Sequence, residues 1–263
     1  MRAVGAGVTA IVPTLNEEEN VAECLGGLSF ADEILVVDSG STDRTREIAD
    51  GMPRTRVLEH EYLGNGPQCN WAMDQASEPW VFIVDADERV PPELGSEIRE
   101  LLDCESGPRS DIFFVRRRNV FLGRPILHSG WGTDRLVRLV RRGTARYPER
   151  RVHSDIETDG RGGRRRVPTL STPLEHVTAK TLPAYLEKLH RYAAWGAEDL
   201  YRSGRRAGLP TIVLRSLWRF VRTFFVQAGF LDGRHGLLVC ALQSYGTFLK
   251  WFSLWERRRL EEI

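Results

Sequence analysis

Four short apolar runs alternate with helical segments over the first 90 residues, and this rhythm constrains the fold more than any other feature of the chain. The runs begin at residues 8, 32, 55 and 80 and read VTAIVPT, DEILVVDSG, TRVLEHEY and WVFIVDAD. Short stretches rich in Val and Ile and bounded by turn residues are typical of strands. Strands separated by helices in this way predict an α/β fold with a parallel, doubly wound sheet.

The segments between these runs are predicted to form helices. The first reads NEEENVAECLGGL from residue 16, with apolar residues on one stripe and acidic residues in the first turn, where they complement the helix dipole. Asn16 is the expected N-cap of this helix. Ser41 or Thr42 is the expected N-cap of the next one, because such side chains accept hydrogen bonds from the first helical amides.

Polar residues follow three of the four strands at the point where each strand ends. They occupy the segment 13–17, Asp38 and Ser39, and Asp85 and Asp87. Ligands of doubly wound sheets bind at the carboxyl ends of the strands, so we expect these residues to share one edge. Each motif alone is equally well explained as a cap of the following helix, but three together favour a binding site.

The acidic run after the fourth strand, Asp85-Ala86-Asp87-Glu88, requires a positive partner, because burying a charge without one is costly. A carboxylate at the sheet edge can accept hydrogen bonds from a ribose or a base. Asp87 is suited to hold a hard divalent cation, which prefers oxygen ligands and brings its remaining charge to phosphate. The predicted partner is therefore Mg²⁺ or Mn²⁺ carrying a diphosphate.

Composition and motifs argue against several classes of protein. The net charge is +1, so no global charge indicates a nucleic-acid binder. No GxxxxGK[ST] loop is present, and the GAG at 5–7 precedes the first strand, where a dinucleotide fingerprint does not lie. The N-terminus lacks the apolar core of a signal peptide, and no segment reaches the roughly 18 apolar residues of a spanning helix. We expect a cytoplasmic protein, soluble or peripheral on the inner face of the membrane.

The strand-end motifs resemble the nucleotide-sugar half of the family-two inverting glycosyltransferases, which have the GT-A fold; they read VPTLNEEENVAECL, VVDSGSTDRT and VDADERV. Three later segments resemble one branch of this family, which contains the lipopolysaccharide-core β-glucosyltransferases; they are 117–142, 151–160 and 229–256. The resemblance implies a GT-A catalytic domain over 1–176, with a nucleotide-sugar half over about 1–90 and an acceptor half over 91–176. An amphipathic helical appendage would follow over 177–263.

The resemblance also implies a reaction and roles for individual residues. A sugar would pass from a nucleoside-diphosphate sugar, with a UDP-sugar favoured, to a hydroxyl of a glycan or lipid-linked acceptor in cell-envelope or polysaccharide biosynthesis, such as that of lipopolysaccharide. Asp38 would contact the base or ribose, Asp85 the ribose, and Asp87 the Mg²⁺ or Mn²⁺ on the diphosphate. The residues expected to bind the nucleotide sugar are Pro13, Thr14, Leu15, Glu17, Asp38, Ser39, Gln68, Asp85, Ala86 and Asp87.

Inversion at the anomeric carbon requires a base within about 3 Å of the attacking hydroxyl. Asp134 stands where the branch has an aspartate, although Thr133 replaces the proline that usually precedes it. Asp155 is the other candidate, next to Ser154, which occupies the place of the family's glutamate. Serine cannot act as the base at neutral pH without help. The base is therefore Asp134, which we favour, or Asp155 with a shifted backbone, or else the protein is impaired.

Competing interpretations accompany two of these residues. Asp134 could instead form an ion pair with Arg135 or Arg138. His153, beside Ser154, is a candidate second metal ligand or hydrogen-bond donor to phosphate, and a purely structural role for it is equally favoured. His128 and His176 are weaker candidates.

The C-terminal region contains three apolar stretches with helical periodicity, over 181–204, 209–230 and 236–255. Thr181 is the expected cap of the first. Arginines edge the aromatic face of the second, a pattern that suits the surface of an anionic membrane. A lipid-linked acceptor gives such attachment a purpose. Packing of these helices on one another, or in a homodimer, is the alternative.

The same residues also bear on other activities. A transferase acting on polyprenyl phosphate, and a glycosyltransferase-like protein that binds the donor without turnover, both stay open. A phosphatase of the haloacid dehalogenase type also ends a strand with two aspartates, but it needs Thr or Val where this chain has Arg89. A sugar-1-phosphate nucleotidyltransferase needs a Gly-rich basic loop near residue 13, which VPTLNEEEN does not provide.

Overall fold

The computed structural model describes residues 6–147, 157–158 and 167–261. The chain forms two compact units. The first comprises residues 1–117 and 135–176, and the second comprises residues 118–134 and 177–263. The segment 118–134, which the sequence placed within the acceptor half, thus groups with the C-terminal helices.

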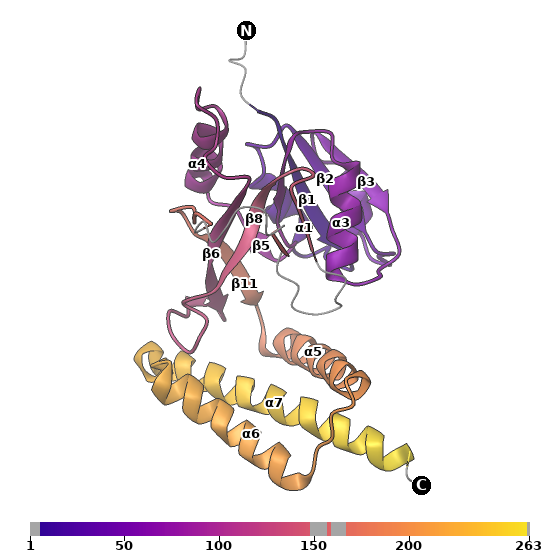
Figure 1. Cartoon of the computed structure of the whole chain (residues 1–263), viewed down its shortest axis with the longest axis vertical. Coiled ribbons are helices and arrows are strands. Elements are labelled where there is room, and N and C mark those ends of the chain that lie inside the picture. Colours follow the sequence, from indigo (N-terminus) through magenta and orange to yellow (C-terminus); the bar gives the residue numbers. More distant parts are fainter. Residues whose placement is uncertain (1–5, 148–156, 159–166, 262–263) are drawn as a thin grey trace. The chain divides into compact units, whose positions relative to one another are not determined.

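The four strands expected in the first 90 residues are present and parallel. They are β1 (Val8–Thr14), β2 (Glu33–Asp38), β3 (Thr55–Glu59) and β4 (Trp80–Ile83), with β1 between β2 and β4 and with β3 outside β2. In the register of β1 and β2, Thr14 lies opposite Asp38, so both strands end at the same level. The prediction of a parallel sheet is confirmed for this half of the chain (Figure 1).

Antiparallel pairings extend the sheet beyond β4. The strand order is β3-β2-β1-β4-β8-β6-β11-β5, and the added strands are β5 (Glu88–Arg89), β6 (Ile112–Phe121), β8 (Arg135–Arg141) and β11 (Leu174–Ala179). The strand β8 is antiparallel to both β4 and β6, and β11 is antiparallel to β5. A short β7 (Arg124–Pro125) pairs with β6, while β9 (Ala145–Arg146) and β10 (Glu157–Thr158) form a separate pair.

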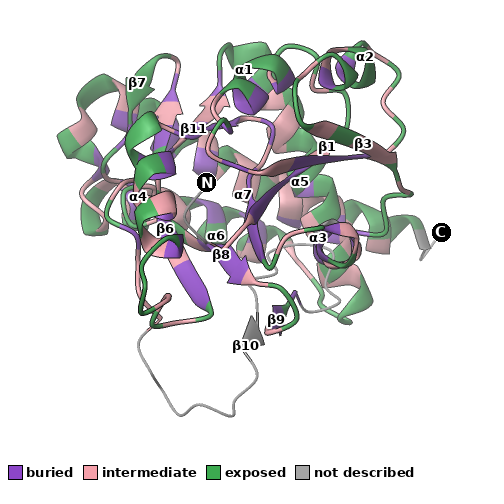
Figure 2. Ribbon diagram, turned by 90° about the horizontal axis from the view of Figure 1, so that it is seen from above, coloured by how far each residue is buried: buried purple, intermediate pink, exposed green. Residues whose placement is uncertain are grey.

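Helices of the first unit cover both faces of this sheet. They are α1 (Val21–Gly26), α2 (Thr45–Asp50), α3 (Asn65–Gln75) and α4 (Pro92–Leu102). Successive strand residues point to opposite faces, and one core accordingly gathers Val12, Val36 and Phe82 with side chains of α1, α2 and α4. The other face gathers Ile11 and Leu35 with side chains of α3. Figure 2 shows these central strands as buried. The sheet is therefore doubly wound, as expected.

The caps predicted for the first two helices were wrong. Helix α1 begins at Val21, after Asn20, and Asn16 has a positive φ of 56° in the preceding loop. Helix α2 begins at Thr45, after Arg44, so neither Ser41 nor Thr42 caps it. The side chain of Asn16 instead binds the loop that follows β2: its Oδ1 accepts a hydrogen bond from the Thr42 amide, at 2.8 Å.

The second unit is a set of helices: α5 (Leu182–Arg202), α6 (Leu209–Val221), the π-helical η1 (Arg222–Val226), the 3₁₀ turn η2 (Gly229–Asp232) and α7 (Gly233–Glu261). Thr181 caps α5 by accepting the Ala184 amide, as predicted. Both α5 and α6 pack on α7, and α6 and α7 lie side by side (Figure 1). Of the helices in the described part of the chain, none is long and apolar enough to cross a membrane.

Candidate active site

Two loops at the carboxyl edge of β1 and β2 hold each other in place. The amides of Asn16, Glu17 and Glu18 donate in turn to the side chains of Ser41 (2.8 Å), Thr45 (2.7 Å) and Asp43 (3.1 Å). Hydrogen bonds of this kind satisfy backbone donors that no strand or helix uses. The segment that follows β1 is therefore fixed before any ligand binds.

Asp38, at the end of β2, is fully buried and accepts four hydrogen bonds. The donors are the hydroxyls of Thr14 (2.9 Å) and Ser41 (2.5 Å) and the amides of Gly40 (3.1 Å) and Ser41 (2.8 Å). These bonds tie the ends of β1 and β2 to the loop that carries Ser39. Asp38 thus shapes this edge, whatever further contact it makes.

Gln68 of α3 closes the same edge from another side. Its side-chain amide donates to the hydroxyl of Ser39 at 3.0 Å, and its Oε1 lies 2.8 Å from Nδ1 of His60, whose ring stacks on Trp71. Gln68 is fully buried, whereas Leu15 is half exposed at the same edge. The amide of Ser39 donates to the carbonyl oxygen of Thr14 at 2.9 Å, so Thr14, Asp38, Ser39 and Gln68 form one connected polar network.

Arg138 of β8 supplies the positive charge that the acidic run requires. Its Nη2 lies 2.7 Å from Oδ2 of Asp85 and 2.5 Å from Oε1 of Glu88, and Arg138 is almost completely buried. Nη1 of Arg117 lies 3.4 Å from the same oxygen of Glu88. For two of the three carboxylates, the expected metal is thus replaced by arginines of the protein itself.

The two carboxylates beside Arg138 differ in their exposure to water. The side chain of Asp85 is 39% exposed and that of Glu88 is not exposed at all. Burial raises the pKa of Glu88 above its usual value, despite the arginine. For Asp85, burial acts in the same direction, but the charge of Arg138 prevails and lowers its pKa. Asp85 is therefore held as an oriented anion that still reaches solvent.

Asp87 lies beside His176, which the sequence ranked below His153 as a candidate metal ligand. Nε2 of His176 is 3.3 Å from Oδ2 of Asp87, and both side chains are largely buried. His176 reaches this position because β11 pairs with β5, which sets His176 opposite Glu88. No motif links two residues so far apart in the chain. The only signal was the alternating pattern of LEHVTA, which indicates a strand.

Asp87 and His176 suit a divalent cation that is shared with a phosphate ligand. Together they offer one carboxylate and one imidazole, and no larger group of His, Cys, Asp and Glu side chains arranged for a metal occurs among the described residues. Mg²⁺ at phosphate sites commonly takes only one or two carboxylates and fills its other positions with phosphate and water. His153, the other candidate ligand, lies outside the described residues.

Of the two candidate bases, only Asp134 lies in the described part of the chain. It belongs to the second unit, where Nδ2 of the buried Asn119 lies 3.0 Å from the carbonyl oxygen of Trp131 and 3.5 Å from Oδ2 of Asp134. Its suggested ion-pair partner Arg138 is engaged with Asp85 and Glu88. Asp155 and Ser154 lie outside the described residues.

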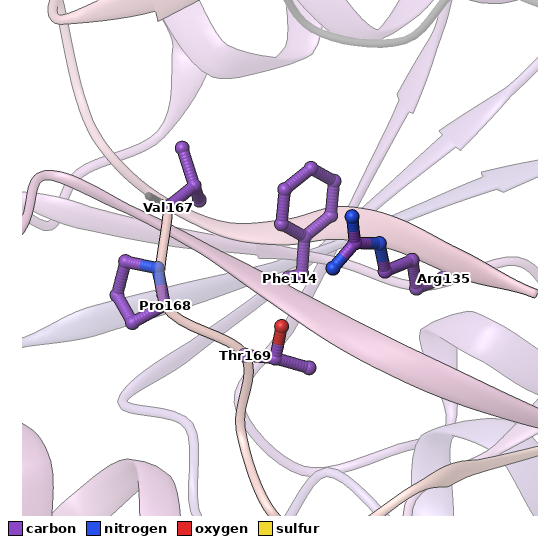
Figure 3. Close-up of a pocket in the computed structure, with 5 residues that line it drawn as sticks. All are labelled: Phe114, Arg135, Val167, Pro168 and Thr169. Atoms are coloured by element: carbon purple, nitrogen blue, oxygen red, sulfur yellow. The ribbon is translucent and has the colours of Figure 1, made fainter. Parts of the chain in front are cut away.

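A cavity of about 580 Å³ opens on the first unit (Figure 3). It is lined by Phe114, Arg135, Val167, Pro168 and Thr169. The guanidinium of Arg135 lies 4.8 Å from the centre of the Phe114 ring, a cation–π contact. An aromatic face beside a cation suits a polar, anionic sugar, and no sequence motif marks Phe114 or Arg135 for such a role.

Comparisons with known proteins give the family. Residues 9–167 match the family model described as glycosyl transferase family 2. The lipopolysaccharide core biosynthesis glycosyltransferase LpsC of Rhizobium meliloti is 28% identical over 97% of this chain and 94% of its own length. The uncharacterized glycosyltransferase RT0209 of Rickettsia typhi is 23% identical over 95% of this chain and 87% of its own length.

The chain is also similar to solved structures. Staphylococcus aureus TarS 1–349 in complex with UDP-GlcNAc is 16% identical, with a TM-score of 0.47 over 97% of this chain and 92% of that one. Glucosyl-3-phosphoglycerate synthase of Mycobacterium tuberculosis is 24% identical, with a TM-score of 0.35 over 44% of this chain and 45% of that one. The family match does not depend on them. It runs from β1 to Val167, more than half of the chain, and it agrees with the doubly wound sheet that carries the site. The chain therefore belongs to glycosyl transferase family 2 and is a glycosyltransferase of the GT-A fold.

Proposed function

We propose that this glycosyltransferase moves a sugar from a UDP-sugar to a hydroxyl of a glycan or lipid-linked acceptor in the synthesis of the cell envelope, the lipopolysaccharide core being the favoured setting. The observation that carries the proposal is the pairing of Asp87 with His176 beside an Asp85 held by Arg138. The similarity to LpsC over nearly the whole of both chains supports the setting.

The donor would lie along the carboxyl edge of the sheet. The network of Thr14, Asp38, Ser39 and Gln68 would receive the base and ribose, with the half-exposed Leu15 against them. Asp85, whose charge is fixed but accessible, would accept hydrogen bonds from the ribose hydroxyls. This division follows from exposure: a fully buried carboxylate shapes a site, and a partly exposed one can also contact a ligand.

The diphosphate would lie next to Asp87. Asp87 and His176 would hold Mg²⁺ or Mn²⁺, which when bound supplies positive charge where the leaving diphosphate develops negative charge. The pairs of Arg138 with Asp85 and Glu88 keep the loop 85–88 in one conformation, so Asp87 needs no rearrangement to bind. Asp87 and Asp85 thereby serve different parts of the same donor.

The acceptor hydroxyl must lose its proton to a base as the new bond forms. Asp134 is our first choice and Asp155 our second, as the sequence indicated. Asn119 supports the choice of Asp134, since its amide is close enough to orient that carboxylate. The cavity beside Phe114 and Arg135 is a candidate for another part of an anionic acceptor.

Such an acceptor would be reached in the cytoplasm, at the inner face of the membrane where lipid-linked glycans are built. Two alternatives use the same donor site: transfer to polyprenyl phosphate, and donor binding without turnover. Both alternatives predict that the donor binds, and they differ from our proposal in its fate. In the first the sugar passes to a phosphate, and in the second it is not transferred.

The test is a thermal-shift screen of UDP-, GDP- and dTDP-sugars with Mn²⁺, followed by assays of UDP release. A donor at a hundredfold excess over its Kd should stabilise the protein by about 2.7 kcal/mol. We expect a UDP-sugar to do so, and UDP release to rise when deglycosylated lipopolysaccharide is added. Release stimulated by polyprenyl phosphate instead would favour the first alternative, and binding without release the second. If no nucleotide sugar binds, the proposal fails.

A further inference from the structure

Helix α6 of the second unit turns its apolar side toward solvent. Its large apolar side chains, and those of the η1–η2 segment that follows, are between 48% and 70% exposed. They form what we call the outer row: Leu209, Val213, Leu214, Leu217, Trp218, Phe225, Val226, Phe230 and Leu231. A patch of this kind on a soluble protein marks an interaction site.

The opposite side of α6, which packs on α7, is unusually polar. Ser216 is buried, and its carbonyl oxygen accepts the hydroxyl of Ser244 at 2.7 Å. Nη2 of Arg219 donates to Oε1 of Gln243 at 2.6 Å. Thr223 is fully buried, and its hydroxyl donates to the backbone carbonyl of Arg219. A surface helix normally buries its apolar stripe and exposes its polar one. In α6 the apolar Ile212 is buried, but the polar Ser216 is buried as well, and most of the large apolar side chains are exposed, so the outer row needs an apolar partner.

The charge around the outer row is strongly positive. The segment from Ser203 to Trp255 contains seven basic residues and a single acidic one, Asp232. Five of the seven are exposed, Arg205, Arg206, Arg215, Arg222 and Arg234, whereas Arg219 and Lys250 are partly buried. Asp232 does not offset them at the surface: its side chain is 6% exposed and accepts the amides of Leu127 and His128 as well as facing the His128 ring.

We propose that the outer row is the surface by which the protein lies on an anionic lipid membrane. Apolar side chains of a helix enter the boundary between headgroups and acyl chains, and flanking arginines bind the phosphates. A second copy of this chain would also cover the apolar side chains, but it would bring two arginine-rich rims together. An anionic bilayer supplies the opposite charge, which decides between the two partners.

This inference rests on the second unit alone and does not depend on sugar transfer. Vesicle binding and UDP binding are measured separately, so either proposal can fail without the other. Such a surface would nevertheless place the enzyme where a lipid-linked acceptor is presented.

The experiment is co-sedimentation of the full-length protein with phosphatidylcholine vesicles, with or without about 30% phosphatidylglycerol. Trp218→Glu places a charge in the outer row, and Leu260→Glu is the matched control, since Leu260 is equally exposed at the far end of α7. We expect the native protein to bind the anionic vesicles and to be released by 0.5 M salt, as an electrostatic contribution of this kind requires. Trp218→Glu should lower the binding about tenfold, and Leu260→Glu should change it less than about twofold.

Because both side chains project into solvent, neither substitution should alter the melting temperature or the binding of UDP. Binding that is equal for neutral and anionic vesicles, or equal for Trp218→Glu and the native protein, would overturn the proposal. A dimer in sedimentation velocity that Trp218→Glu dissociates would also overturn it, because a second copy would then cover the row.

Discussion

Replacing Arg138 with methionine tests the electrostatic account of the acidic loop. The substitution keeps the length of an apolar stem but removes the guanidinium that lies 2.7 Å from Asp85 and 2.5 Å from Glu88. Removing one partner of a buried ion pair costs about 3–5 kcal/mol. Asp85 is partly exposed and can be hydrated, whereas Glu88 cannot, so the loss falls on Glu88. Because Arg117 stays near Glu88, at 3.4 Å, we expect the lower end, about 3 kcal/mol at pH 7.

The loss should depend on pH in a defined direction. Burial already raises the pKa of Glu88 in the folded protein, and removing Arg138 raises it further. A group with a raised folded pKa contributes stability that is present below its unfolded pKa and is lost as pH rises through the folded pKa. The substitution also removes the cation that lowers the pKa of Asp85. The stability that this lowered pKa contributes is present only above the unfolded pKa of Asp85, so it is lost at neutral pH. Both effects make the destabilisation larger at neutral pH than near pH 4.

The assay is urea unfolding followed by circular dichroism from pH 4 to 8, with Arg146→Met as the control. Arg146 pairs with Asp74 at the same 2.5 Å, but both side chains are more than half exposed, so its loss should cost about 0–1 kcal/mol. The double variant Arg138→Met/Glu88→Gln removes the stranded charge and should recover about 2 kcal/mol of the loss. Equal, pH-independent losses for Arg138→Met and Arg146→Met would refute the reasoning.

Two further predictions concern the donor and the acceptor. His176→Gln should weaken Mn²⁺-dependent UDP binding by at least about tenfold, because it removes a proposed ligand of the cation. His190→Gln, on the exposed side of α5, is the control and should leave the binding unchanged. Calorimetric titration of UDP checks this, and equal affinities of the two variants would remove His176 from the metal site. Asp134→Asn should lower kcat about 10²–10⁴-fold without altering UDP binding, while Asp155→Asn should have little effect. Steady-state assays that gave the reverse order would make Asp155 the base.

The parallel half of the fold could be predicted because its signals are local. Each buried run of β1, β2 and β4 is continuous in sequence, and the residue that ends it is read directly, so Asp38 and Asp87 were placed at one edge without coordinates. The predicted caps of α1 and α2 failed for the opposite reason. Asn16 has a side chain suited to either a helix or a loop, and only the approach of the Thr42 amide decides which.

The partners of the acidic loop could not be predicted, because antiparallel strands from later in the chain supply them. Arg138 arrives on β8 and His176 on β11, and their registers depend on the packing of the whole sheet. The orientation of α6 is a similar case. Its apolar stripe is evident from the sequence, but periodicity does not say which side of a helix meets α7. The exposure of Leu214, Leu217 and Trp218 in the structure reveals that the stripe faces outward.

The measurement that bears most directly on the central claim is the affinity for UDP with and without Mn²⁺, in the native protein and in Asp87→Asn. This substitution keeps the size of the side chain and removes only the charge proposed to hold the cation. We predict that Mn²⁺ tightens UDP binding to the native protein by at least about tenfold and leaves Asp87→Asn unaffected. An Asp87→Asn protein whose UDP affinity still rises equally with Mn²⁺ would contradict the assignment of the cation, and with it the donor, to this edge of the sheet.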